Sequence, residues 1–300
     1  MTAAPRPAPT ARLGQNQYGK AETRVVRVVR DGAVHHLTDL NVSVALSGAM
    51  DEVHLSGSNA TVLTTDATKN TVYAFARTHG IDSPEAFGIH LARHFTSSQA
   101  SIHRARIRIE SYGWQRIAEP DTGHSFVRDG REVRTAQVEF DGTTWQVLGG
   151  LKELTVLNST DSEFWGFVKD PYTTLPETTD RVLATDVDAR WRYGWNGAGE
   201  QPDWQALYPA VRSRLLSAFA GTYSYSLQQT LYAMGARVVE EVPEVEEVRL
   251  SLPNKHHFLV DLEPFGLTND NEVYLAADRP YGLIEGTVLR EGATAAIPTD

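Results

Sequence analysis

The sequence predicts an α+β fold in which antiparallel sheets carry helices on one face. The order of elements in the first half is strand, strand, helix, helix, strand, strand, and the second half repeats it. Within the first half, residues 102–110 alternate polar and apolar side chains, as in a strand with one face in water. Two copies of this order indicate the duplication of one α+β unit. We therefore expect a disordered tail over residues 1–16, one unit over residues 17–150 and another over residues 151–300.

The elements of the first half follow from local patterns. Residues 25–30 are β-rich, and Asp31-Gly32 favours a type I′ turn into a second strand over residues 34–46. Ser83 is a suitable helix N-cap, and Pro84 follows it at the first helical position. The other predicted elements are a helix over residues 68–78 and strands over residues 102–110 and 136–148.

The elements of the second half follow in the same order. Apolar residues recur at helical spacing over residues 203–220 and 224–239, so each segment is predicted as a helix with one buried face. Residues on both sides of this helical pair have β-rich composition. The predicted strands cover residues 153–168, 186–193, 245–252, 258–262 and 281–289.

Composition excludes several classes of function. The net charge of −10 argues against a broad nucleic-acid or anionic-membrane surface. No apolar run approaches the roughly 18 residues that a membrane-spanning helix needs. The chain has no cysteine, which excludes disulfides, thiolate nucleophiles and Cys-ligated metal centres. Residues 1–10 do not resemble a signal peptide and residues 297–300 carry no peroxisomal address, so we expect a cytoplasmic protein.

Two further patterns do not support a function. His90 and His94 have the i,i+4 spacing of metal ligands, but Leu-Ala-Arg stands between them and the glutamate of the His-Glu-x-x-His motif is missing. We therefore expect no metal site. Residues 194–199 are glycine-rich but lack the spacing of a dinucleotide- or phosphate-binding loop, so we predict an ordinary loop.

Several short segments, taken together and in order, resemble one enzyme family. They are Tyr18-Gly19-Lys20, residues 65–73, Phe164-Trp165-Gly166-Phe167, residues 172–175, Asp180-Arg181, residues 185–189, Gln228 and residues 252–256. Over about residues 17–290 the chain resembles the urate oxidase (uricase) family. This resemblance implies oxidation of urate by O2 and water to 5-hydroxyisourate and H2O2, without a cofactor.

The resemblance also implies an assembly. Members of the family have the tunnelling fold (T-fold), in which each subunit carries two ββαα-type units. The sheets of neighbouring subunits join into barrels, and the barrels stack as a homotetramer. Active sites are therefore expected at subunit interfaces, with residues from both halves of the sequence at each.

The resemblance assigns urate binding to residues whose chemistry suits a flat, anionic purine. Arg181 offers a planar fork for a bidentate contact with one edge of urate. Gln228 presents both a donor and an acceptor, and Phe164 offers a ring face for stacking. By resemblance, further in-plane contacts come from the main chain near Thr65, Asp66 and Leu227.

The resemblance further implies a proton relay of Lys20, Thr65 and His256. A lysine can shuttle protons near neutral pH when desolvation lowers its pKa, and a histidine titrates in this range unaided. The hydroxyl of Thr65 can accept and donate at once, which links the two. Asn254 matches the position that holds oxygen, and later the hydrating water, above the ring. We expect Lys20 and Thr65 to come from the neighbouring subunit.

Two alternatives stay open on sequence alone. The first is another T-fold enzyme that acts on a pterin or purine; such enzymes generally anchor the ring through a glutamate, whereas the anchor here is Arg181 with Gln228. The second is a non-catalytic purine-binding protein, which would need Arg181, Gln228 and Phe164 but not the relay. The presence of all three relay residues counts against it.

Overall fold

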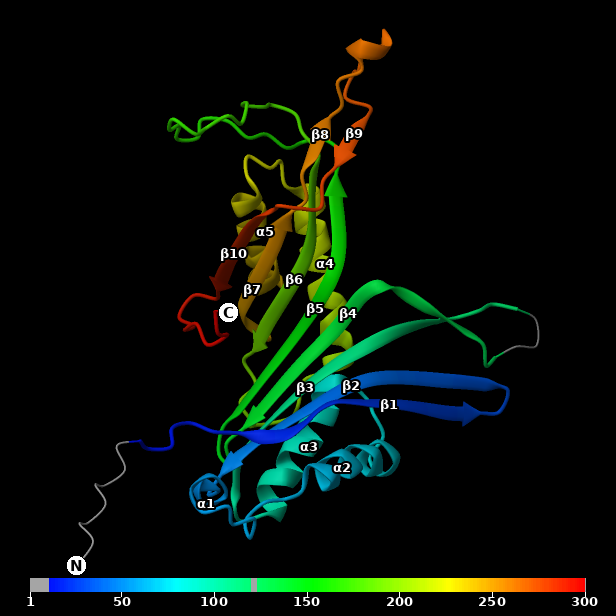
Figure 1. The fold of residues 1–300 in the computed structure, drawn as a ribbon. Helices are drawn as coiled ribbons and strands as arrows, with labels where there is room; N and C mark the ends of the chain where they lie inside the picture. Colours follow the sequence, from blue (N-terminus) through cyan, green and yellow to red (C-terminus); the bar gives the residue numbers. More distant parts are fainter. Residues whose placement is uncertain (1–10, 120–122, 300) are drawn as a thin grey trace, which may run out of the picture.

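One continuous antiparallel sheet runs through the chain in a computed structural model that describes residues 11–119 and 123–299 (Figure 1). The sheet has eight strands, and they follow one another in chain order across it. It does not close on itself, so β1 and β10 form its two open edges. The strands are β1 (Tyr18–Asp31), β2 (Val34–Gly48), β3 (Ile102–Arg116), β4 (Phe126–Phe140), β5 (Trp145–Asn158), β6 (Leu183–Tyr193), β7 (Val245–Asn254) and β10 (Gly282–Leu289).

The helices lie along one face of this sheet, which confirms the predicted α+β architecture (Figure 1). Helix α3 packs on β3 and β4, and α5 packs on β7 and β10. A short two-stranded sheet, β8 (His257–Leu259) and β9 (Tyr274–Ala276), projects beyond the end of β7. The helices are α1 (Asp51–Leu55), α2 (Thr65–Thr78), α3 (Pro84–Ser98), α4 (Trp204–Gly221) and α5 (Leu227–Glu241), with a 3-10 turn at Glu263–Phe265. None of the helices in the described ranges is long and apolar enough to cross a membrane.

The predicted repeat of elements is present. The order β1, β2, α2, α3, β3, β4 is followed by β5, β6, α4, α5, β7, β10, with α1 added in the first half and β8, the 3-10 turn and β9 inserted before β10. Residue 150, where we divided the two units, lies inside β5, and the sheet continues across it. The division into two units stays a prediction. Residues 1–10 of the expected disordered tail lie outside the described residues.

Polar and apolar side chains alternate along β3, as predicted, and give the sheet one apolar and one polar face. Ala105, Ile107 and Ile109 are buried beneath the helices. Each buried isoleucine of this kind contributes roughly 1.5–3 kcal/mol relative to an exposed one. Arg104 and Arg108 lie on the opposite face, which none of the described helices covers.

The predicted strand over residues 136–148 was wrong, because this segment is a hairpin. β4 ends at Phe140 and β5 starts at Trp145. The carboxylate of Asp141 accepts the backbone N–H groups of Thr143 (2.9 Å) and Thr144 (2.7 Å), which closes a local turn. Gly142 takes a φ of 91°, a conformation that other residues rarely adopt.

Two smaller expectations were also wrong. The turn after β1 consists of Gly32 and Ala33, and only Gly32 has a positive φ. A type II′ turn needs a positive φ at the first position alone, whereas the predicted type I′ turn needs it at both. The predicted strand over residues 153–168 ends at Asn158, after which a loop extends to β6.

The arginine of a buried ion pair connects the two halves of the chain. Arg134 on β4 donates to the carboxylate of Glu85 in α3 (2.7 Å), and the two side chains are 12% and 0% exposed. The same guanidinium donates to Gln205 (2.6 Å) and to the carbonyl of Trp204 (3.1 Å) at the start of α4. It also lies 4.6 Å from the ring of Tyr208. One side chain therefore connects α3, β4 and α4.

Arg134→Met is expected to lower the free energy of unfolding by about 3–5 kcal/mol, because Glu85 would remain buried without its cation. Arg131→Met is the matched control: Arg131 is 79% exposed and lies 3.6 Å from Glu153, so its loss is expected to cost less than about 1 kcal/mol. Urea unfolding at one fixed protein concentration measures both. Equal losses in the two variants would contradict the role given to Arg134.

Candidate active site

A cavity of about 470 Å³ lies where the N-terminus of α5, the end of β7 and the loop between β5 and β6 meet. It brings together most of the residues that the sequence singled out, although they come from three separate segments. We call these residues the cavity group: Phe164, Arg181, Leu227, Gln228, Asn254 and His256.

Arg181 is a partly buried cation without a carboxylate partner in the described part of the chain. Its backbone N–H donates to the carbonyl of Ser162 (3.0 Å), and its Nε donates to the Ser162 hydroxyl (3.0 Å). Its guanidinium lies 5.2 Å from the centre of the Phe164 ring. Burial lowers the pKa of Arg181, which indicates that the cation is poorly solvated. Such a group favours an anionic ligand.

The first turn of α5 adds hydrogen-bond donors to the cavity. Ser226 caps the helix by accepting the backbone N–H of Gln229 (3.2 Å). The N–H groups of Leu227 and Gln228 precede the first intrahelical bonds and have no acceptor within the helix. The side-chain amide of Gln228 has no partner among the described residues. Free donors at the positive end of a helix dipole suit an anion.

Asn254 and His256 are held in place by the residue between them. Lys255 forms an ion pair with Asp186 on β6 (2.5 Å). Burial is the largest single influence on the pKa of Asp186 and raises it, but the hydrogen bonds from Lys255 and Thr155 and the charge of Lys255 together outweigh burial, so the pKa lies below its ordinary value. The ring of His256 lies 5.8 Å from that of Phe258. The ion pair thus ties the segment that carries Asn254 and His256 to the sheet.

The other three predicted residues, Lys20, Thr65 and Asp66, do not line this cavity. Lys20 lies on β1, and Thr65 and Asp66 start α2, which packs against β1 at the opposite end of the sheet (Figure 1). The Tyr18 hydroxyl donates to the carbonyl of Leu63 (3.0 Å), which holds the chain before α2 against β1. We call Lys20, Thr65 and Asp66 the β1–α2 group. Six strand-to-strand steps separate β1 from β7, or about 29 Å along the sheet at roughly 4.8 Å per step.

The β1–α2 group also presents free donors. Thr64 caps α2, so the N–H groups of Thr65 and Asp66 have no acceptor within the helix. Asp66 forms an ion pair with Lys69 (2.6 Å). Its pKa is lowered mainly by Lys69, with a smaller effect of the nearby Lys20. The two groups thus each combine a helix N-terminus with chemically reactive side chains.

The cavity also contains residues that the sequence did not single out. His257 and Tyr274 come from β8 and β9, and Asn271 comes from the connection between those strands. Their contribution depends on where the β8–β9 sheet lies relative to the end of β7 and to α5. Nothing in the periodicity of these short segments indicates that placement.

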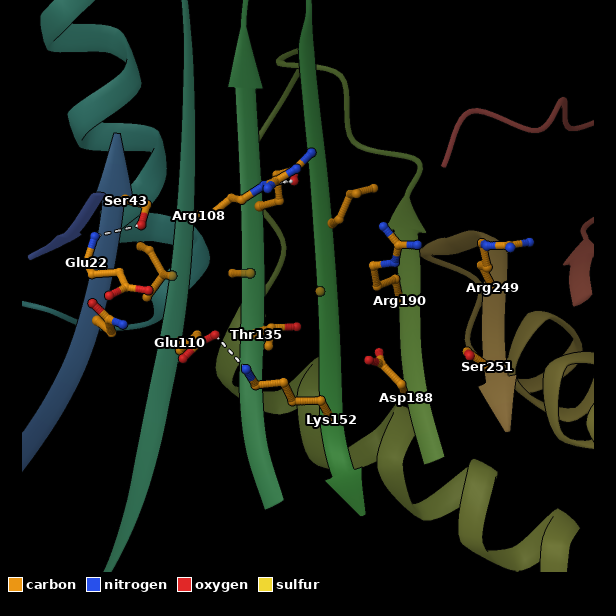
Figure 2. A pocket seen from close by; sticks show the side chains of 16 residues that line it. Glu22, Ser43, Arg108, Glu110, Thr135, Lys152, Asp188, Arg190, Arg249 and Ser251 are labelled. Atoms are coloured by element: carbon orange, nitrogen blue, oxygen red, sulfur yellow. Dashed lines mark hydrogen bonds and ion pairs between the residues drawn. The ribbon is translucent and has the colours of Figure 1, made fainter. Parts of the chain in front are cut away.

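A second hollow, of about 500 Å³, lies on the face of the sheet that the helices leave uncovered (Figure 2). None of the predicted site residues lines it. Its cations have partners within the chain: Lys152 pairs with Glu110 (2.6 Å), and Arg108 donates to Gln137 (2.8 Å). Arg181, which has no carboxylate partner within residues 11–119 and 123–299, makes the first cavity the better candidate for an anionic substrate.

Comparison with known proteins identifies the relatives of this chain. The sequence model of the family described as Uricase matches residues 16–139 and 147–285. A uricase of Arthrobacter globiformis is 53% identical over 286 residues, which cover 95% of this chain and 92% of that protein. A uricase of Emericella nidulans is 39% identical and covers 92% and 96%. The crystal structure of uricase from Arthrobacter globiformis matches with a TM-score of 0.91 and 52% identity, over 97% and 99% of the two chains.

Proposed function

The chain belongs to the uricase family, and on this premise we propose how its residues bind and oxidise urate. It is an oxidoreductase that acts on urate and O2. The relatives are uricases over nearly their whole length, so neither a pterin enzyme nor a non-catalytic carrier is favoured. The observation that carries the proposed site is the partly buried Arg181, which has no carboxylate partner among the described residues, beside the free donors of α5.

We propose that urate binds in the cavity group with its ring plane facing Phe164. The Arg181 fork donates to an anionic edge of the purine, and the Gln228 amide pairs with neighbouring N–H and C=O groups. The backbone N–H of Leu227 adds an in-plane donor. The amide of Asn254 has no side-chain partner among the described residues, which leaves it available to hold O2 and then water above the ring.

The proposed chemistry moves two electrons from urate to O2. Deprotonation makes urate electron-rich enough to supply both electrons itself, so no separate electron carrier is needed. O2 takes up the two electrons and two protons and leaves as H2O2. Water then adds its hydroxyl group to a carbon and its proton to a nitrogen of the oxidised ring, which gives 5-hydroxyisourate. In this scheme Lys20, Thr65 and His256 pass the protons between urate, oxygen and water.

We further propose that each site is completed by a neighbouring copy of the chain. About 29 Å separates the β1–α2 group from the cavity group along the sheet, which is too far for one proton relay. The open edges β1 and β10 provide strands that a neighbouring copy can extend. We propose a homotetramer with an active site at each such interface.

Co-expression of two inactive variants tests this arrangement. Lys20→Met damages the β1–α2 group, and Arg181→Gln damages the cavity group. In mixed oligomers about one quarter of the sites would combine two intact groups, so activity is expected to return to at most about a quarter of wild type. Co-expression of Arg181→Gln with His256→Ala is the matched control, since both residues belong to one cavity and no site is restored. No recovery with the first pair would refute the shared site.

The activity itself is tested on purified protein treated with a chelator and checked for bound chromophore. Urate loss, oxygen uptake and peroxide release are followed together in aerated buffer. Equal rates for all three are expected. Urate that binds without being consumed would favour a carrier, and a failure to bind urate would return attention to pterins.

A further inference from the structure

Three buried hydroxyl side chains lie behind the cavity, between Arg181 and α5. Ser162, Ser224 and Thr230 are each 0% exposed. None of them lines the cavity, so none can touch a ligand there. A buried hydroxyl is costly unless it is hydrogen-bonded, which makes the partners of these three side chains informative.

In the first part of the hydrogen-bond network that these side chains form, Ser162 holds Arg181. Ser162 accepts the backbone N–H of Arg181 at its carbonyl and the Nε at its hydroxyl, both at 3.0 Å. An acceptor at Nε fixes the rotation of the planar guanidinium. The fork formed by its two terminal nitrogens is then directed away from Ser162.

The second link joins the Ser162 segment to the residues before α5. Ser162 and Ser224 form a parallel β-bridge. In this bridge Glu163 N–H donates to the carbonyl of Ser224 (2.8 Å), and Ser224 N–H donates to the carbonyl of Asp161 (2.9 Å). The loop that carries the Arg181 support is therefore fixed to the chain entering the helix.

The third link reaches the helix itself. The hydroxyl of Thr230 donates to the hydroxyl of Ser224 (2.8 Å), which donates to the carbonyl of Ser226 (3.1 Å). Ser226 is the N-cap of α5, and Thr230 lies one turn further on. Both bonds therefore fix the first turn, which presents Leu227 and Gln228.

We propose that Ser162, Ser224 and Thr230 are positioning residues for urate. They set the plane of the Arg181 guanidinium relative to the Leu227 N–H and the Gln228 amide, so that both meet one flat ligand. A planar purine bound from two sides tolerates only about 10–20° of error in its donors. Because each buried hydroxyl has few alternative partners, the network holds one arrangement. The inference rests on the proposed urate site.

The hydroxyl of Thr230 offers the sharpest test. Thr230→Val keeps the shape and removes the donor, whereas Thr230→Ser keeps the donor. Thr230→Val and Ser162→Ala are each expected to raise KM for urate about tenfold while kcat stays within about threefold. Thr230→Ser is expected to retain a KM near wild type. Thr96→Val is the matched control, because that hydroxyl bonds only to backbone carbonyls of its own helix, and its KM is expected to be unchanged.

The outcomes separate this inference from the proposed function. A wild-type protein that oxidises urate, with KM unchanged in Thr230→Val, would overturn the positioning role and leave the function intact. A loss of activity in proportion to the loss of folded protein, with KM constant, would also overturn it. A wild-type protein that does not bind urate would overturn the proposed site itself. If Ser162→Ala does not fold, the comparison of Thr230→Val with Thr230→Ser is sufficient to test the positioning role.

Discussion

Replacing Lys20 by Met is expected to lower kcat for urate oxidation by about 10²–10⁴-fold, the usual contribution of a positioned acid–base group. Methionine has a similar length but carries no exchangeable proton. Lys20 forms no ion pair within the described residues, so the variant is expected to fold normally. Urate affinity should change little, because the cavity group that binds the purine is intact.

Two measurements separate these effects. Oxygen uptake at saturating urate gives kcat, and equilibrium binding of urate without oxygen gives its affinity. Lys152→Met is the matched control, since Lys152 pairs with Glu110 on β3 and belongs to neither group, and kcat should stay within about twofold. A fall in kcat of less than tenfold for Lys20→Met, or a parallel loss of urate binding, would remove Lys20 from the relay.

Arg181→Gln is expected to lower kcat/KM for urate by about 10²–10³-fold. Glutamine keeps polar atoms in the cavity but loses the charge and the two-pronged fork, and each hydrogen bond to a charged group is worth about 1.5–3 kcal/mol. Stability should not fall with activity. Burial disfavours the Arg181 cation, and no carboxylate in the described part of the chain offsets this.

The prediction for Arg181→Gln is therefore checked by two measurements, one of activity and one of stability. Steady-state kinetics gives kcat/KM, and urea unfolding gives the midpoint of the same sample. The midpoint is expected to be equal to or higher than that of wild type, as is common when a functional group is removed from a binding site. An unchanged KM, or a lower midpoint accompanying the activity loss, would show that Arg181 has a structural role. Arg131→Gln, at an exposed position, should change neither.

The elements that could be predicted are those whose signal is local. The side chains of Ile107 and Ile109 alternate with arginines, and Ser83 and Asp203 stand as caps before their helices. The hairpin at Asp141 was missed even though Asp-Gly is a turn signal, because β-rich residues continue on both sides of it. Local composition identifies strands more reliably than it identifies their ends.

The site was harder to predict because it depends on distant parts of the chain. The resemblance named Arg181 and Gln228, but only the folded loop between β5 and β6 brings them to one cavity. The distance from Lys20 to this cavity depends on strand order, which no single segment encodes. Ser162 and Thr230 left no signal at all, since serine and threonine are common in loops and helix starts.

The two open edges of the sheet set a constraint on biosynthesis. If the edges pair in the proposed oligomer, folding of a new chain is first-order whereas meeting a partner is second-order, so the interval with unpaired edges lengthens as the cellular concentration of the chain falls. During that interval β1 exposes Val26, Val28 and Val29 along an unpaired backbone, which is a template for unwanted strand addition. Arginines interrupt this run at positions 27 and 30, and charged side chains on an edge discourage such pairing. Slow translation keeps the concentration of new chains low. Each new molecule would then depend for a longer time on Arg27 and Arg30 to prevent unwanted pairing along β1.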